Sequence, residues 1–345
     1  MPDLLAPAAV FTVTGAIVLL CAPLARRLGL LSRPGGHRIH AGPVPLVGGI
    51  AMFSGLMCGF LVADVPPPLL AAAAVLVVTG VLDDLRDLRP QVRFAAQIVA
   101  GLIMMAWGHV QLHDLGALLS EQPLVLGDLA APFTLLAVVG VVNAFNLVDG
   151  MDGLAGGIAL IALLLLAAAT AAGGRTADLG LLMILAAAIA GFLPFNLHYP
   201  GHRHASVFMG DAGSLFLGLM LAWCLVDLSQ GRQSVIAPVT ALWIVALPLL
   251  DTISVMMRRL LNGRSPFQAD CDHLHHLLHA LGLSRGQTVA AMLLMTLLLG
   301  TLALACRRLG VPEHWLFAGF CGLSGLYYGS VELGWRRVRM QTAPA

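Results

Sequence analysis

Three acidic clusters stand at the ends of apolar segments in this chain: DDLRD at 83–87, NLVDGMDG at 146–153 and FMGD at 208–211. A carboxylate in or beside hydrocarbon is costly, so in membrane proteins such groups usually serve chemistry or transport. Grouped acidic side chains can hold a divalent metal ion together with the phosphates of a substrate. The three clusters are therefore the candidate site.

The first cluster contains two carboxylates at helical spacing. Asp83 and Asp87 are predicted to share one helical face at i,i+4, and Asp84 to lie about 100° round the axis. Carboxylates that lie this close repel, so they share a proton or hold a cation. The alternative is a solvated helix end that Arg86 and Arg89 neutralise.

The second cluster repeats polar residues every third position. Asn143, Asn146, Asp149 and Asp152 predict a polar ridge along the end of one helix. Glycines beside them would let the backbone approach a ligand closely. A structural hydrogen-bond network between helices is the alternative.

The third cluster places Asp211 near a predicted helix start, where free N–H groups and the helix dipole favour an anion. Taken in isolation, Asp211 is better explained as a plain helix cap. Phe208, three residues earlier, could stack on a base or simply pack.

Histidines gather in DCDHLHHLLH at 270–279, where His273, His275 and His276 could line one surface. Zinc is one interpretation, but neither HExxH nor a Cys/His spacing is present. Imidazoles near arginines suit phosphate equally well. Asp251, inside a predicted helix, either pairs with an arginine or belongs to an ion path.

Apolar segments must position these residues. The 345 residues are 59% hydrophobic and 11% charged, with mean hydropathy +0.89, which is typical of an integral membrane protein. We predict an all-α, polytopic helix bundle that forms one domain over 1–345, with about eleven transmembrane helices. These lie at 4–24, 45–63, 67–82, 92–107, 131–148, 154–173, 177–195, 212–228, 235–257, 288–306 and 312–331.

Arginines set the predicted orientation, since the chain has nineteen basic residues and no lysine. Fifteen arginines fall in one set of alternate loops, and only Arg175, Arg232, Arg307 and Arg308 in the other. By the positive-inside rule the acidic clusters face the cytoplasm, the N-terminus is periplasmic and the C-terminus is cytoplasmic. This predicts a multi-pass protein of a bacterial cytoplasmic (inner) membrane. The six scattered cysteines indicate neither a disulfide framework nor a cysteine metal site.

Five segments together resemble one known family. In order they are VPLVGG at 44–49, LDDLRD at 82–87, NAFNLVDGMDGLAGG at 143–157, VFMGDAGS at 207–214 and DHLHHLL at 272–278. This ordered set resembles the polyprenyl-phosphate N-acetylhexosamine-1-phosphate transferases (glycosyltransferase family 4). Within it, the chain looks most like the branch that makes undecaprenyl-pyrophosphoryl-N-acetylglucosamine.

The resemblance implies a reaction: an N-acetylhexosamine 1-phosphate, N-acetylglucosamine 1-phosphate above all, passes from the UDP-sugar to undecaprenyl phosphate and UMP leaves. This would be the first membrane step of a cell-envelope glycan such as lipopolysaccharide. The expected cofactor is Mg²⁺, with Mn²⁺ as its substitute. The expected partners are the two substrates and membrane lipid, without nucleic acid, and a homodimer is left open.

The resemblance also implies roles for individual residues. Asp211 would be the metal ligand, and Asp83 with Asp84 the catalytic pair at the lipid phosphate. The substrate-binding residues would be Arg38, His40, Asn146, Asp149, Asp152, Phe208, His273, His275 and His276. The chain departs from the family pattern at Arg38, where lysine is usual before the histidine, and at Cys271, where arginine is frequent.

Two other classes of protein stay open. An aspartate-rich membrane prenyltransferase would also use DDxxD with magnesium and pyrophosphate. An ion or metal transporter would line a pathway with buried Asp and His.

Overall fold

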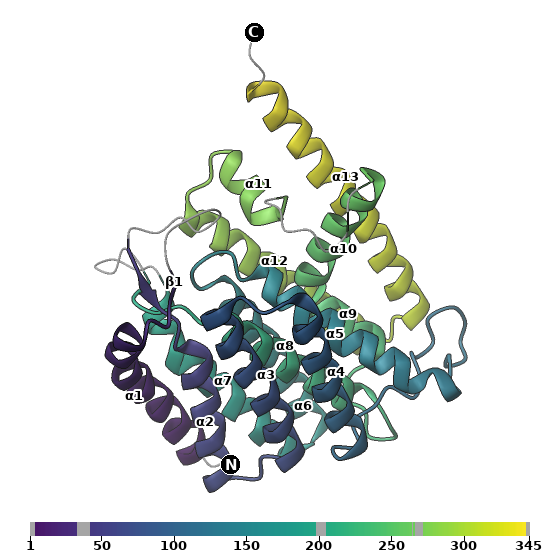
Figure 1. Cartoon of the computed structure of the whole chain (residues 1–345). Coiled ribbons are helices and arrows are strands. Elements are labelled where there is room, and N and C mark those ends of the chain that lie inside the picture. The colour runs from purple at the N-terminus through teal and green to yellow at the C-terminus, as the bar shows by residue number, and fades with distance from the viewer. Residues whose placement is uncertain (1–3, 33–41, 198–204, 264, 266–271, 343–345) are drawn as a thin grey trace.

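The computed structural model describes residues 4–32, 42–197, 205–263, 265 and 272–342 (Figure 1). Its architecture is that of an all-α membrane protein. Its helices are α1 (Leu5–Leu28), α2 (Gly48–Val62), α3 (Pro67–Arg86), α4 (Pro90–Ala106), η1 (Gly127–Leu129), α5 (Ala130–Val148), α6 (Leu154–Gly173), α7 (Thr176–Asn196), α8 (Gly210–Ser229), α9 (Pro238–Ile244), α10 (Ala246–Leu261), α11 (Leu274–Ala280), α12 (Arg285–Arg308) and α13 (Glu313–Thr342).

Helices occupy every segment for which an apolar helix was predicted. Among the described residues, seven helical segments are long and apolar enough to cross a membrane, or eight if the bent pair α9 and α10 is one span. Helices α2 and α4 are apolar but shorter. Eleven crossings therefore stay a prediction.

Helix α8 lies in the middle of the bundle, and almost all of its side chains are buried (Figure 1). Glycines let its neighbours approach its first turn. A Cβ at Gly49 of α2 would lie 2.3 Å from the nitrogen of Gly213, and one at Gly80 of α3 would lie 2.3 Å from Ala212 Cα. This close packing brings the end of α3 to the beginning of α8.

The prediction of one continuous helix at 235–257 is wrong. The structure has two helices, α9 and α10, whose axes differ in direction by 80° across Val245. Pro248 explains the break, because it has no amide hydrogen and its ring conflicts with the carbonyl of Ile244, four residues earlier. The bend lets α10 run toward the end of the molecule where α11 and the C-terminal part of α13 lie (Figure 1).

Two short strands were not predicted. β1 (Leu31–Ser32) pairs antiparallel with β2 (Val44–Pro45) just before α2. Leu46 forms a parallel bridge with Phe208, so the segment before α2 lies against the segment before α8. A bridge between Asp114 and Val125 likewise closes a small hairpin between α4 and α5.

Candidate active site

A cavity of about 710 Å³ opens at the end of the bundle where α3, α5 and α7 finish and α8 and α12 begin. Nine of the residues predicted for the site line it: Asp84, Asn146, Asp149, Asp152, Phe208, Asp211, His273, His275 and His276. All three acidic clusters and the histidine segment therefore contribute to one site. Arg38 and His40 lie outside the described residues, as does Cys271.

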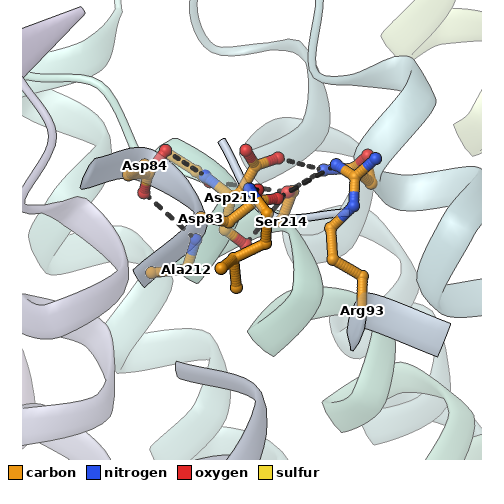
Figure 2. A network of polar contacts seen from close by, with 9 residues as sticks. Asp83, Asp84, Arg93, Asp211, Ala212 and Ser214 are labelled. Atoms are coloured by element: carbon orange, nitrogen blue, oxygen red, sulfur yellow. Dashed lines mark hydrogen bonds and ion pairs between the residues drawn. The ribbon is translucent and has the colours of Figure 1, made fainter. Parts of the chain in front are cut away.

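Asp84 comes from α3 but caps α8 (Figure 2). Its Oδ1 accepts a hydrogen bond of 3.0 Å from the backbone N–H of Asp211, and its Oδ2 accepts one of 3.4 Å from Ala212. Gly210 makes room for it, since a Cβ there would lie 2.4 Å from Asp84 Oδ2. The capping carboxylate of this helix is therefore Asp84, and Asp211 stands beside it in the first turn.

Asn146 orients the Asp211 side chain. Its Nδ2 donates to Asp211 Oδ1 at 2.6 Å and to Ser214 Oγ at 2.9 Å. Asn146 belongs to the last turn of α5 and Asp211 to the first turn of α8. The amide thus fixes one carboxylate oxygen of Asp211 within the cavity lining.

The predicted polar ridge does not exist as one helical face. α5 ends at Val148, so Asp149 and Asp152 lie in the turn that follows. Asn143 belongs to a structural contact, because its Nδ2 donates to Gln97 Oε1 on α4 at 2.7 Å. Asp149 and Asp152 still reach the cavity, through the turn rather than along the helix.

The predicted i,i+4 pair of Asp83 and Asp87 is also wrong. α3 ends at Arg86, and Asp87 turns the chain with a left-handed φ of 51°. Asp83 is 4% exposed; its Oδ1 accepts from the Leu88 N–H at 2.7 Å, and its Oδ2 pairs with Arg93 Nη1 at 3.0 Å (Figure 2). Asp83 fastens the turn between α3 and α4 and is not among the described residues that line the cavity.

Four carboxyl groups line the cavity, those of Asp84, Asp149, Asp152 and Asp211, together with the guanidinium groups of Arg259 and Arg285. Burial raises the pKa of Asp149 well above its usual range, and the charges of Asp211, Asp152 and Asp84 raise it further. A divalent cation would offset this repulsion. Magnesium prefers oxygen ligands and keeps several waters, so one or two carboxylates and substrate phosphates can hold it.

The donor set of the cavity fits such an ion. Within the described part of the chain, no group of three or more His, Cys, Asp or Glu side chains is arranged to hold a metal by itself. A metal ion bound here would therefore complete its coordination with water and substrate.

His275 is the most buried histidine of the segment, at 1% exposure. Its burial, and then the charges of His276 and His273, lower the pKa of its ring to about 3. It packs directly on Gly150, where a Cβ would lie 2.2 Å from its Nε2. Neither ring nitrogen has a hydrogen-bond partner among the described residues, so a neutral imidazole is left for a ligand.

Sequence reasoning missed Asn196, a buried residue at the end of α7 that lines the cavity. Its Oδ1 accepts from the Gly153 N–H at 2.8 Å, and its Nδ2 donates to the Val207 carbonyl at 3.0 Å. One amide thus joins the turn that carries Asp152 to the segment that carries Phe208. The available signal was an Asn at the end of an apolar segment, as for Asn146. Arg285, at the start of α12, is a second cavity residue that was not predicted.

A cavity lined by carboxylates, amides and imidazoles thus lies at one end of an apolar helix bundle, which is the arrangement of a membrane enzyme with a polar active site. The family model of glycosyl transferase family 4 matches residues 66–229. By this match and by its similarity to the relatives below, the chain belongs to glycosyl transferase family 4.

Similar curated proteins span nearly the whole chain. The undecaprenyl-phosphate alpha-N-acetylglucosaminyl 1-phosphate transferase of Escherichia coli (strain K12) is 34% identical over 96% of this chain and 91% of its own length. The protein of that name from Yersinia pestis is 35% identical over 96% and 92%. The one from Pasteurella multocida (strain Pm70) is 36% identical over 93% and 91%.

Proposed function

We propose that this protein transfers N-acetylglucosamine 1-phosphate from UDP-N-acetylglucosamine to undecaprenyl phosphate and releases UMP. The observation that carries the proposal is the convergence of nine residues from four separate motifs on one cavity. Relatives with this activity in their names, aligned over more than nine tenths of the chain, support the choice of sugar and acceptor.

The chemistry joins two anions. An oxygen of the lipid phosphate attacks the phosphorus that bears the sugar, a new P–O bond forms, and the bond to the UMP oxygen breaks. The electron pair of that bond leaves with UMP. Asp211 is the proposed ligand of Mg²⁺, or of Mn²⁺ in its place, which when bound neutralises pyrophosphate charge and stabilises the leaving group.

The residues of the chain bind and orient the two substrates. His273, His275 and His276 line the cavity and are proposed to hold phosphate and sugar oxygens. Arg38 and His40 are proposed to share this task. Asp149 and Asp152 are proposed to bind the nucleotide and metal-bound waters, and Phe208 to stack on uracil.

Asp83 and Asp84 are proposed to act at the lipid phosphate. Asp84 lines the cavity next to Asp211, whereas Asp83 occupies the adjoining position on α3 in its ion pair with Arg93. The acidic end of the bundle is proposed to face the cytoplasm of a bacterium, where UDP-sugars are made. Eleven membrane crossings, a periplasmic N-terminus and a cytoplasmic C-terminus belong to the same proposal.

Turnover by purified protein tests the proposal. UDP-N-acetylglucosamine, undecaprenyl phosphate and Mg²⁺ should give a pyrophosphate-linked lipid and an equal amount of UMP. UDP-N-acetylgalactosamine serves as the comparison donor, and we expect it to react more slowly than UDP-N-acetylglucosamine. Absence of lipid product with every UDP-N-acetylhexosamine would contradict the proposal. Product from an isoprenyl pyrophosphate instead would identify a prenyltransferase.

A further inference from the structure

Asp251 is a buried acid that contacts the histidine segment and is not among the described residues that line the cavity. It belongs to α10 and is 1% exposed. Its Oδ2 contacts His273 Nδ1 at 2.8 Å. Its Oδ1 accepts from the Leu274 N–H at 2.9 Å and from the Tyr327 hydroxyl at 2.9 Å. One carboxylate thus joins α10, the start of α11 and α13.

The contact determines where His273 carries its proton. An ionised carboxylate only accepts hydrogen bonds, so the Nδ1 of His273 must be the donor. In the neutral ring Nε2 then carries the lone pair, so it can accept a hydrogen bond from a substrate hydroxyl, such as one on the sugar, and cannot donate to a phosphate oxygen. His273 itself lines the cavity, with its ring parallel to that of His275 at 5.7 Å.

We infer that Asp251 is a positioning residue for the reaction: it holds the His273 ring in place with the proton on Nδ1, so that Nε2 serves the substrate. Tyr327 holds Asp251 in turn. The last helix, α13, thereby acts on a cavity to which it supplies none of the described lining residues. The inference rests on the proposed function, in that His273 is taken to meet a substrate.

Asp251→Asn separates this role from simple packing. The Leu274 N–H can only donate, so the oxygen of the new amide must stay where Oδ1 is now. The amide NH₂ then takes the place of Oδ2 and donates to His273 Nδ1, which drives the proton to Nε2. The substitution keeps the shape of the side chain and reverses the tautomer of the ring.

Kinetics provide the first measurement. We expect Asp251→Asn to lower kcat by about 100-fold or more, since loss of the correct tautomer costs a catalytic histidine up to roughly 10⁴-fold in a serine protease. Tyr327→Phe is the matched control, because it removes one hydrogen bond from the same carboxylate and leaves the tautomer unchanged. It should lower kcat by no more than about fivefold, as expected for one neutral hydrogen bond. Equal losses in the two variants, or near-normal turnover by Asp251→Asn, would overturn the inference.

The protonation state provides the second measurement, which a purely structural role would not change. In protein labelled with ¹⁵N-histidine, the signal of His273 is identified by its absence in His273→Asn, whose amide can still donate to Asp251. We expect a proton on Nδ1 in the wild type and none on Nδ1 in Asp251→Asn. A bare Nδ1 in the wild type, or an unchanged Nδ1 in the variant, would overturn the inference.

The two proposals can fail separately. If Asp251→Asn does not fold, the wild-type spectrum decides alone: a proton on Nδ1 supports the inference and a bare Nδ1 overturns it. If the wild type turns over no UDP-sugar, the proposed function is wrong. The spectra still decide whether Asp251 sets the tautomer of His273.

Discussion

Asp83 and Asp84 are adjacent in the sequence, but their carboxylates make different contacts. Asp84 holds the first turn of α8 beside Asp211, and Asp83 pairs with Arg93 across the turn to α4. On a helix, successive side chains point about 100° apart. A motif that contains two adjacent acids therefore supplies one of them to the cavity and the other to the support of the turn.

The proposed role of Asp83 can be separated from its ion pair. Asp83→Asn should lower kcat and kcat/KM together, because the proposed partner is the lipid phosphate and the donor site stays intact. Arg93→Gln is the control that breaks the same ion pair and keeps the carboxylate. We expect a much larger loss of turnover in Asp83→Asn than in Arg93→Gln. Equal losses would restrict Asp83 to fastening the turn, and a change in KM for the UDP-sugar alone would place it at the nucleotide.

Asp211 is expected to be essential for metal-dependent turnover. Asp211→Asn should lower turnover by more than the roughly 10- to 100-fold that is typical when a residue hydrogen-bonded to a metal ligand is replaced. Added Mg²⁺ should not restore turnover. Asp227→Asn is the control, because Asp227 lies on the same helix away from the cavity. Turnover is measured against Mg²⁺ concentration in both variants. Full activity in chelator, or near-normal activity of Asp211→Asn, would rule Asp211 out as the ligand.

His275 should remain neutral in the folded protein at every pH at which the enzyme works, because its pKa is lowered to about 3. An unfolded histidine takes up a proton near pH 6.5. The depressed pKa therefore contributes stability that is fully present above about pH 6.5 and is lost progressively as pH falls toward 3. Between pH 7 and pH 5, the unfolding temperature should fall more for the wild type than for His275→Asn. An equal fall in the unfolding temperature of the two proteins would contradict the prediction that the His275 ring is buried and neutral.

His275→Ala tests whether the His275 ring binds substrate or zinc. We expect it to lower activity without unfolding the protein, and purified enzyme to contain no stoichiometric zinc. Zinc that is lost together with activity in this variant would show a metal site instead.

At the scale of the elements, the site depends on how closely helix ends approach. The end of α3 meets the beginning of α8 where Gly80 and Gly210 leave no side chain between them. Asn146 and Asn196 then join the ends of α5 and α7 to the same region. Contacts between helix ends therefore position Asp84 and Asp211, whereas Asp149 and Asp152 belong to the turn that Asn196 holds.

Gly210→Ala tests this arrangement. Gly210 has a φ of 69°, and a Cβ there would lie 2.4 Å from Asp84 Oδ2. Gly231→Ala is the control, since Gly231 has a φ of 78° but open space around it. Both changes strain the backbone by about 1–2 kcal/mol. Only Gly210→Ala should also displace Asp84, and its turnover should fall well below that of Gly231→Ala. Similar turnover in the two variants would show that the Asp84 cap is dispensable.

At the scale of the whole molecule, all three acidic clusters lie at one end of the helix bundle. That end should face the cytoplasm, because most arginines lie on the same side of the predicted spans. In a variant without native cysteines, Arg89→Cys should resist impermeant thiol reagents in intact cells and react once the cells are opened. Arg232→Cys, exposed in the opposite set of loops, should react in both. The reverse pattern would overturn the orientation.

The sequence by itself determined the class of protein, the positions of most helices and nine of the residues that line the cavity. Hydropathy is a property of short segments, so every predicted apolar segment is helical, although the one at 235–257 is divided between α9 and α10. The acids and histidines that border those segments had to gather because helix ends meet at one side of a bundle. Hence Asp84, Asp211 and His275 were predicted for the site without knowledge of their contacts.

Only the tertiary structure decided how these residues are used. Whether a helix continues through Asp87 or Asp149 depends on contacts from other elements, such as Arg93 and the turn held by Asn196. The partners of Asp251 are 22 or more residues away along the chain, and no local pattern brings them together. A carboxylate acquires its role from the donors that surround it, and those donors are assembled by packing between segments distant in sequence.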